Sequence, residues 1–365
     1  MIEIKKGRII KEIFDREKVQ GFLVLIEGRE EKCIAYPALT GEVKAGDEVL
    51  VNTTAVSLNL GSGGYHYIMA NLNRTEKELK PGGHIMKLRY TPMQLKVLSV
   101  EEEESPYHEA LKEKDSLEGM PVLVASLHSM LAPLCLQLEK EGFKTAYVMT
   151  DGAALPIYFS NTVDWLKKNR ILAGTVTIGH AFGGDLEAVN IYSGLLAARE
   201  VFKPDAIIVS MGPGIVGTGT KWGFTGIEQG EILNAVENLK GMPLCVPRIS
   251  FADGRERHRG ISHHTLTVLT RVCRAKAVLP IPVMEDDKIE YVLEQLRKEN
   301  LLDRYEVCLE ESTAILDILR QSELKVSTMG RGIDEDKEFF LALGAAAHAA
   351  VKLLKGQPLR RIRLV

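Results

Sequence analysis

The sequence predicts an α/β protein in which a small all-β, barrel-like domain precedes a doubly wound, mostly parallel sheet. From residue 7 to residue 98, short β-rich runs recur between turns, and from residue 120 onward apolar runs alternate with amphipathic segments. The first rhythm is typical of a closed β-sheet and the second of strands joined by helices. A chain of 365 residues is long enough for both domains.

The first hundred residues predict the barrel. Runs such as GFLVLI (21–26) and EKCIAY (31–36) are separated by turns that contain Gly41, Gly46 and the glycine-rich stretch 61–64. Such short strands leave unpaired edges unless an antiparallel sheet closes or packs on another sheet. We therefore expect a barrel-like domain over residues 1–100.

Residues 101–119 predict an acidic linker. Between Glu101 and Glu118, eight acidic residues stand against two lysines, which gives this stretch a net charge of −6, and it contains no apolar run. Runs of like charge usually stay hydrated. We expect a solvated connector that takes no part in the chemistry.

Residues 120–365 predict a Rossmann-like domain. Runs such as TAYVMT (145–150) and AIIVSM (206–211) are apolar without interruption, as in strands buried on both faces of a parallel sheet. Amphipathic segments between the runs predict helices, including one that starts at Leu186 and a last one from Asp334 to Leu354. The run KVSTMG (325–330) predicts a further strand.

Charge and cysteine content exclude several classes of protein. Lys and Arg total 46 and Asp and Glu total 49, so the net charge of −3 gives no general attraction to nucleic acid or anionic membranes. The five cysteines are scattered and never spaced as CxxC, which argues against a disulfide framework and a thiolate zinc site. The start of the chain lacks the apolar core of a signal peptide, and no run is long enough to span a bilayer. We expect a cytoplasmic protein with no membrane or nucleic-acid partner.

The glycine-rich segment SMGPGIVGTGTKWGFTG (210–226) is the strongest candidate for a binding loop. Ligands bind outside the carboxyl ends of parallel strands, and glycines let backbone N–H groups approach a phosphate there. Gly212, Gly214 and Gly217 match GxGxxG, but no helix opens at the third glycine, and residues 219–221 read GTK where a P-loop has GK[ST]. A long turn without a ligand stays the alternative. The predicted ligand-binding residues are Gly212, Gly214, Gly217, Gly219 and Thr220.

A second group of candidates follows two neighbouring apolar runs. Asp151 comes directly after the run 145–150, and His180 follows the next run along the chain, where it could act as a general base or metal ligand. Asp185 is a candidate acid or base, although the position also suits the N-cap of a helix from Leu186. A histidine at a strand end often only bonds the backbone, so a structural role for His180 stays open.

The segment DGRERHRGISHHT (253–265) predicts an anion site. Its arginines and a helix start at Ser262 suit phosphate or carboxylate, and His258 is a further acid or base candidate. His263 and His264 are adjacent, about 100° apart on a helix, so we expect them not to face one ligand and predict no metal site. A solvated basic loop is the alternative. The predicted ligand-binding residues here are Arg255, Arg257, Arg259 and Ser262.

Several segments together resemble an uncharacterised bacterial family, the domain-of-unknown-function family 3866. They are AYPALTG, VLVNTTAVSLNLGSGGYHYIMANL, GHIMKLRYTPMQ, SPYH, GHAFGGDLEAVNIYSGL, SMGPGIVGTGTKWGFTG and DGRERHRGISHHT. The resemblance covers nearly the whole chain. It implies a bacterial cytoplasmic protein, and it implies no activity, cofactor or catalytic residue.

Two functions remain open at this point. The first is an enzyme or former enzyme that binds a small anionic or phosphorylated molecule, such as a nucleotide or sugar phosphate, for transfer or hydrolysis. The second is a non-catalytic ligand-sensing or scaffold protein whose barrel contacts a protein partner. The sequence leaves the cofactor unknown, and a homodimer is an expectation from the general frequency of such assemblies.

Overall fold

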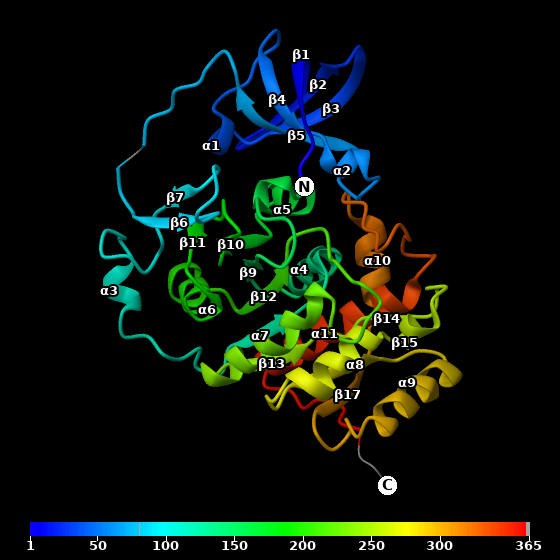
Figure 1. The fold of residues 1–365 in the computed structure, drawn as a ribbon. Helices are drawn as coiled ribbons and strands as arrows, with labels where there is room; N and C mark the ends of the chain where they lie inside the picture. Colours follow the sequence, from blue (N-terminus) through cyan, green and yellow to red (C-terminus); the bar gives the residue numbers. More distant parts are fainter. Residues whose placement is uncertain (80, 363–365) are drawn as a thin grey trace. The chain divides into compact units, whose positions relative to one another are not determined.

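The computed structural model describes residues 1–79 and 81–362. The chain forms two compact units, one made of Met1–Gly82 and Leu88–Lys96 and the other of Gly83–Lys87 and Val97–Val365 (Figure 1). The first unit contains a closed β-barrel, and the second contains an all-parallel sheet flanked by helices. The predicted fold class, a Rossmann-like α/β protein with a small N-terminal barrel, is confirmed.

The barrel closes, in the described residues, with the strand order β1-β2-β3-β5-β4. Its elements are β1 (Ile4–Arg16), β2 (Val19–Ile26), β3 (Arg29–Ala35), α1 (Pro37–Thr40), β4 (Glu48–Asn52), α2 (Thr54–Ser57) and β5 (Tyr65–Asn71). Because β4 and β5 exchange places, β3 pairs with β5 in parallel, whereas the other pairs are antiparallel. The closure is therefore mixed and not the fully antiparallel closure that the sequence suggested. Phe22, Val24 and Val49 are among the buried side chains inside it.

The acidic segment belongs to the second unit. Two short strands, β6 (Ile85–Lys87) and β7 (Leu95–Val97), precede it, and it contains the helix α3 (His108–Leu111). Leu117 is fully buried, and the Glu102 carboxylate accepts hydrogen bonds from the backbone N–H groups of Ser99 at 2.5 Å and His84 at 2.7 Å. Residues 103–104 and 112–115 are exposed, so the acidic segment meets solvent along much of its length and is anchored to unit 2 at Glu102 and Leu117.

An eight-stranded parallel sheet forms the centre of unit 2 within the described residues, in the order β11-β10-β9-β12-β8-β13-β16-β17. Its strands are β8 (Pro121–Val124), β9 (Thr145–Thr150), β10 (Leu172–Thr177), β11 (Leu186–Glu187), β12 (Ala206–Met211), β13 (Met242–Cys245), β16 (Val278–Pro282) and β17 (Glu306–Glu310). The chain leaves β8 toward β9 and leaves the adjacent β12 toward β13, in opposite directions. The loops after these two strands therefore diverge, and a crevice is expected at such a reversal.

Helices cover both faces of the sheet (Figure 1). One face packs against α6 (Ile191–Ala197), α7 (Glu228–Asn238), α8 (His263–Thr267) and α9 (Asp286–Lys298), with π-helical extensions η3 (Ala198–Phe202) and η6 (Val268–Val272). The other packs against α4 (Leu131–Lys140), α5 (Asn161–Lys168), α10 (Ala314–Gln321) and α11 (Lys337–Leu354). Along β12, Ile207 and Val209 join the first core and Ile208 the second. This alternation explains why the strand reads as one continuous apolar run.

The predicted helix start at Leu186 is wrong. Residues 186 and 187 form the edge strand β11, which pairs with the end of β10, and α6 begins only at Ile191. Asn190 is the N-cap, because its side chain accepts hydrogen bonds from the N–H groups of Tyr192 and Ser193. Asp185 therefore caps no helix here.

Two further predictions near the C-terminus need correction. The run KVSTMG (325–330) is a loop and not a strand, because residues 360–362 occupy the free edge of β17: Leu309 N donates to Arg360 O and Ile362 N to Val307 O. The last helix begins at Lys337, three residues after the expected Asp334. Within residues 1–79 and 81–362, no helix has the length and apolarity that crossing a bilayer requires.

Candidate functional site

The glycine-rich loop after β12 and the basic loop after β13 meet at the carboxyl edge of the sheet. A Cβ placed on Gly217 would lie 3.5 Å from Cε1 and 3.8 Å from Nε2 of His264. The Phe224 ring stacks on the His264 ring with centroids 4.0 Å apart. A Cβ on Gly219 would lie 3.9 Å from Nη2 of Arg257. Two segments that the sequence singled out independently thus form one site.

The glycines of the first loop have different roles. A Cβ on Gly212 would come within 2.5 Å of the Ala154 carbonyl oxygen, so Gly212 is needed for close packing. Gly219 has a positive φ of 76°, which favours glycine, and it lies at the exposed tip of the loop. The Thr220 hydroxyl accepts a hydrogen bond from Gly223 N at 3.1 Å, so this side chain stabilises the turn.

Asp253 holds two guanidinium groups of the basic loop in place. Its carboxylate accepts from Nη2 of Arg248 at 2.9 Å and from Nε and Nη2 of Arg255 at 2.9 and 2.8 Å. Arg248 and Asp253 are both buried. The hydrogen bonds and positive charge of Arg255, with Arg248 behind it, hold the pKa of the Asp253 carboxyl well below its ordinary value.

A second carboxylate, Asp336, extends this ionic group. It is fully buried and accepts from Ser250 Oγ at 2.8 Å and from Nε of Arg331 at 3.0 Å. Burial raises the pKa of Asp336 despite these partners. Nη2 of Arg331 also lies 3.8 Å from Asp253, so the guanidinium groups of Arg248, Arg255 and Arg331 share the two carboxylates and leave one positive charge in excess.

His258 is a buried, neutral imidazole beside this ionic group. Its Nδ1 lies 2.8 Å from Ser262 Oγ and 3.1 Å from Nη1 of Arg248. A guanidinium only donates, so Nδ1 is the accepting nitrogen and Nε2 carries the proton. Burial and the charge of Arg248 lower the pKa of His258 to about 4.

His263 and His264 turn toward His258, contrary to the expectation that they could not face one ligand. The ring centroids lie 4.9 Å apart for His258 and His263, 5.2 Å for His258 and His264, and 4.2 Å for the adjacent pair. Both residues stand at the start of α8, where no preceding helical turn restricts χ1, so the 100° rule does not separate their rings. Burial, followed by charges on neighbouring groups, lowers the pKa of both, that of His264 to about 3.

A pocket of about 280 Å³ opens between the loops after β8 and β12 and residues 325–329. His128 and Gly214 line it. His128 Nε2 lies 2.6 Å from Ser160 Oγ, and Nδ1 lies 3.3 Å from the Met211 carbonyl oxygen, which fixes the proton on Nδ1. Burial lowers the pKa of His128 to about 4. The position of this pocket matches the reversal of strand order between β8 and β12.

Glu228, the first residue of α7, is an acid candidate that the sequence did not reveal. Its Oε1 accepts a hydrogen bond from Thr150 Oγ1 at 2.5 Å, and a Cβ on Gly152 would come within 2.8 Å of Oε2. Burial raises the pKa of Glu228 to about 7, and the nearby charge of Asp151 acts in the same direction. Such a carboxyl exchanges a proton near neutral pH. The sequence feature that could have identified Glu228 is its position just after the glycine-rich loop.

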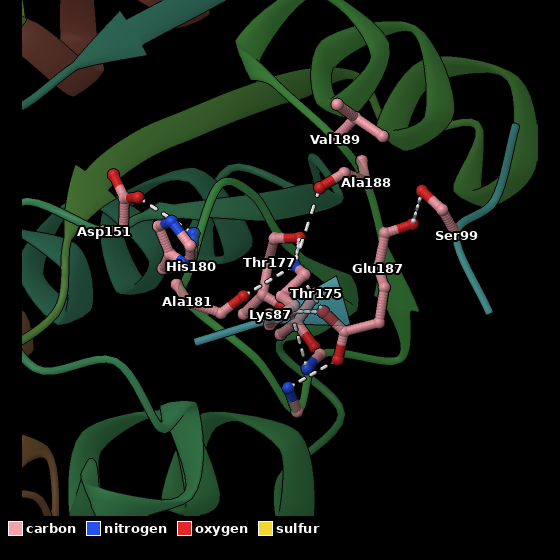
Figure 2. A network of polar contacts seen from close by, with 12 residues as sticks. Lys87, Ser99, Asp151, Thr175, Thr177, His180, Ala181, Glu187, Ala188 and Val189 are labelled. Atoms are coloured by element: carbon pink, nitrogen blue, oxygen red, sulfur yellow. Dashed lines mark hydrogen bonds and ion pairs between the residues drawn. The ribbon is translucent and has the colours of Figure 1, made fainter. Parts of the chain in front are cut away.

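The candidates Asp151, His180 and Asp185 lie on the other half of the sheet. Asp151 Oδ2 accepts from the backbone N–H of His180 at 2.8 Å (Figure 2). Asp185 accepts hydrogen bonds from Thr175 N and Oγ1, both at 2.9 Å, and from Lys167 Nζ at 2.5 Å. Its carboxylate therefore links Thr175 in β10 to Lys167 in α5. Four strand spacings of about 4.8 Å each separate β10 from β13. The structure therefore does not group these residues with the three histidines.

A buried lysine organises that half of the sheet (Figure 2). Lys87 is 1% exposed, and its Nζ donates to the carbonyl oxygens of Ala181 at 2.6 Å and Thr177 at 3.0 Å. Nζ also pairs with the Glu187 carboxylate at 2.8 Å. Glu187 in turn accepts from Thr177 Oγ1 and Gly183 N, each at 2.6 Å. Because the ammonium group is fully engaged with protein acceptors, this network holds the loop after β10 in place.

Arg259, another predicted ligand-binding residue, packs on aromatic rings. Its guanidinium lies over the rings of Phe251 and Tyr291, 5.4 and 5.6 Å from their centroids. The residues that the sequence predicted and the structure brings together are Gly217, Gly219, Arg255, Arg257, His258 and Ser262. The residues that join them without having been predicted are Arg248, His263, His264 and Asp336, and Arg331, which the sequence offered either for this crevice or as a surface residue, also joins them.

Removal of the Lys87 ammonium tests the network of Figure 2. Lys87→Met leaves the Glu187 carboxylate, whose side chain is 13% exposed, without its cation, so we expect a loss of about 3 to 5 kcal/mol in unfolding free energy. Lys87→Met combined with Glu187→Gln should cost clearly less than the sum of the single changes. Urea denaturation of the four proteins measures this coupling, and additive costs would contradict it.

Neutralising Glu228 tests its raised pKa. The folded pKa of about 7 exceeds the ordinary 4.5, so the folded state keeps a proton that the unfolded chain releases, and stability falls as pH rises from about 4.5 to 7. Glu228→Gln should remove this fall, which amounts to about 2 to 3 kcal/mol between pH 5 and 8. Urea denaturation across that range measures it. Glu294→Gln, which changes an exposed helical glutamate that does not act on Glu228, is the matched control, and equal pH slopes in wild type and Glu228→Gln would refute the assignment.

Comparison with known proteins gives a family. The model of the family described as protein of unknown function (DUF3866) matches residues 32–347. No curated protein matches the sequence. The match spans most of the chain and includes the last two barrel strands, the parallel sheet and both loops of the site. The resemblance seen in the sequence motifs is therefore confirmed, and the chain belongs to the DUF3866 family.

Proposed function

We propose that this protein binds a small anionic molecule, of the phosphorylated class, where the glycine-rich loop meets the basic loop. The observation that carries the proposal is the convergence of Gly217, Gly219, Arg257 and His264 at the carboxyl edge of the sheet. Ligands of open α/β sheets bind at this edge. The start of the same glycine-rich loop, at Gly214, lines a pocket of about 280 Å³, which has room for part of a small molecule.

Charge supports an anion at this place. The ionic group of Arg248, Arg255 and Arg331 with two aspartates already has a positive excess. Arg257 is exposed, and among residues 1–79 and 81–362 no carboxylate forms an ion pair with it. Its guanidinium is available for a bidentate contact with phosphate.

Backbone donors support the same ligand class. The N–H groups of Gly219, Thr220 and Lys221 donate to no protein acceptor in the described part of the chain, whereas those of Thr218 and Gly223 are used inside the loop. Successive N–H groups in a turn bind anions in other proteins, and here they lie close to Arg257. Transfer or hydrolysis at a phosphoryl centre also needs a proton acceptor, and the neutral imidazole of His128, which lines the pocket with Gly214, is of the right type.

Arg257→Ala tests the proposal. Thermal shift and calorimetry with inorganic phosphate, nucleotides and sugar phosphates should identify one class that binds the wild type, and the variant should bind it about 10- to 100-fold more weakly. The matched control is Arg259→Ala, which removes the same charge from the same loop but from a guanidinium stacked on aromatic rings. Equal binding by all three proteins would contradict the site. Absence of any phosphorylated ligand would favour the non-catalytic scaffold.

A further inference from the structure

The three histidines beside the proposed anion site are gathered as metal ligands are. Each of His258, His263 and His264 offers a ring nitrogen, and the three nitrogens lie within 4.8 Å of one another. Within residues 1–79 and 81–362, this is the one such group of three metal-ligating side chains. Ligand nitrogens around a tetrahedral zinc ion are about 3.4 Å apart, given bonds of about 2.0–2.1 Å, so modest side-chain rotations would close the site.

We propose that His258, His263 and His264 bind a divalent transition-metal ion, of which zinc is the best fit. An independent observation supports it: the Nε2 atom of His263 is buried and has no hydrogen-bond partner among the described residues. A buried nitrogen without a partner is costly unless something satisfies it. A metal ion at the centre of the three rings would do so.

The surroundings hold the rings in position for this role. Phe224 stacks on His264 with an angle of 6° between the ring planes, which fixes the orientation of that imidazole. Ser262 Oγ lies 2.8 Å from His258 Nδ1. When Nε2 of His258 binds the metal, its proton is carried by Nδ1 instead, and the serine oxygen accepts it while the Arg248 Nη1 contact is released. Hydrogen bonds of this kind orient metal-bound histidines in general.

The charges nearby select the metal and its fourth ligand. Asp253 and Asp336 are committed to guanidinium groups, so no carboxylate is left for calcium or magnesium, which prefer oxygen. Imidazole nitrogens suit zinc, cobalt, nickel and copper. The positive excess that would repel a bare dication favours an anion in the fourth position, on the side of Arg257 and Gly219. That last step rests on the proposed function, whereas the three-histidine site does not.

The test uses the full-length protein and the metal alone. After treatment with a chelator and its removal, the protein in phosphate-free buffer is titrated with zinc, and with cobalt to record the visible absorption of a tetrahedral site. We expect one metal ion per chain. His263→Ala and His264→Phe should each weaken binding by more than about 100-fold, because even the loss of an outer partner of a metal ligand costs 10- to 100-fold. His264→Phe keeps an aromatic ring against Phe224 and so preserves the stacking.

The matched control is His84→Ala, since His84 is an exposed histidine paired with Glu102 outside this group. It should bind the metal as the wild type does. No stoichiometric binding by the wild type, or unchanged binding by both histidine variants, would overturn the inference. Phosphate binding without metal binding would leave the proposed function intact and reject the metal site, and metal binding without any anionic ligand would do the reverse.

Discussion

The constraint on which this structure depends is that the central strands are buried on both faces. Ile207, Ile208 and Val209 illustrate it, because successive side chains enter opposite cores. In either core, burial of an unpaired charged side chain would be costly. Polar chemistry is thereby confined to the strand ends. At the carboxyl ends of β12 and β8 the chain leaves in opposite directions. The loop after β12 carries the glycines, and the segment after the neighbouring strand β13 carries the arginines and the three histidines.

At that edge, two carboxylates hold the charged side chains around them in place. Asp253 and Asp336 hold the guanidinium groups of Arg248, Arg255 and Arg331 close together despite their like charge. The resulting positive excess, together with burial, keeps the neighbouring imidazoles neutral. A neutral imidazole offers a lone pair at neutral pH, which a protonated one does not. Burial and these charges together thus leave the histidines with free lone pairs at neutral pH.

The spacing of apolar residues and the turn residues in the sequence were sufficient to predict the barrel and the parallel sheet, and they also singled out the two loops that meet at its carboxyl edge. Two local predictions failed. Asn190 and not Asp185 caps the next helix, and residues 360–362, not the strand predicted at KVSTMG, pair with β17. The helical-wheel argument separated His263 from His264 because it assumed the middle of a helix. Lys87 lies 90 residues from Thr177 in sequence, and no motif joins them, so only the fold could reveal that contact.

One loop connects the two polar groups at this edge. It begins after β12, its middle packs Gly217 and Phe224 against His264, and it ends where Glu228 enters α7 and accepts the hydrogen bond from Thr150. A change in the backbone of this loop therefore reaches both the histidines and a carboxyl whose pKa is near 7. Substitutions that are meant to affect only one of the two groups therefore have to lie outside the loop, on a side chain that belongs to that group alone.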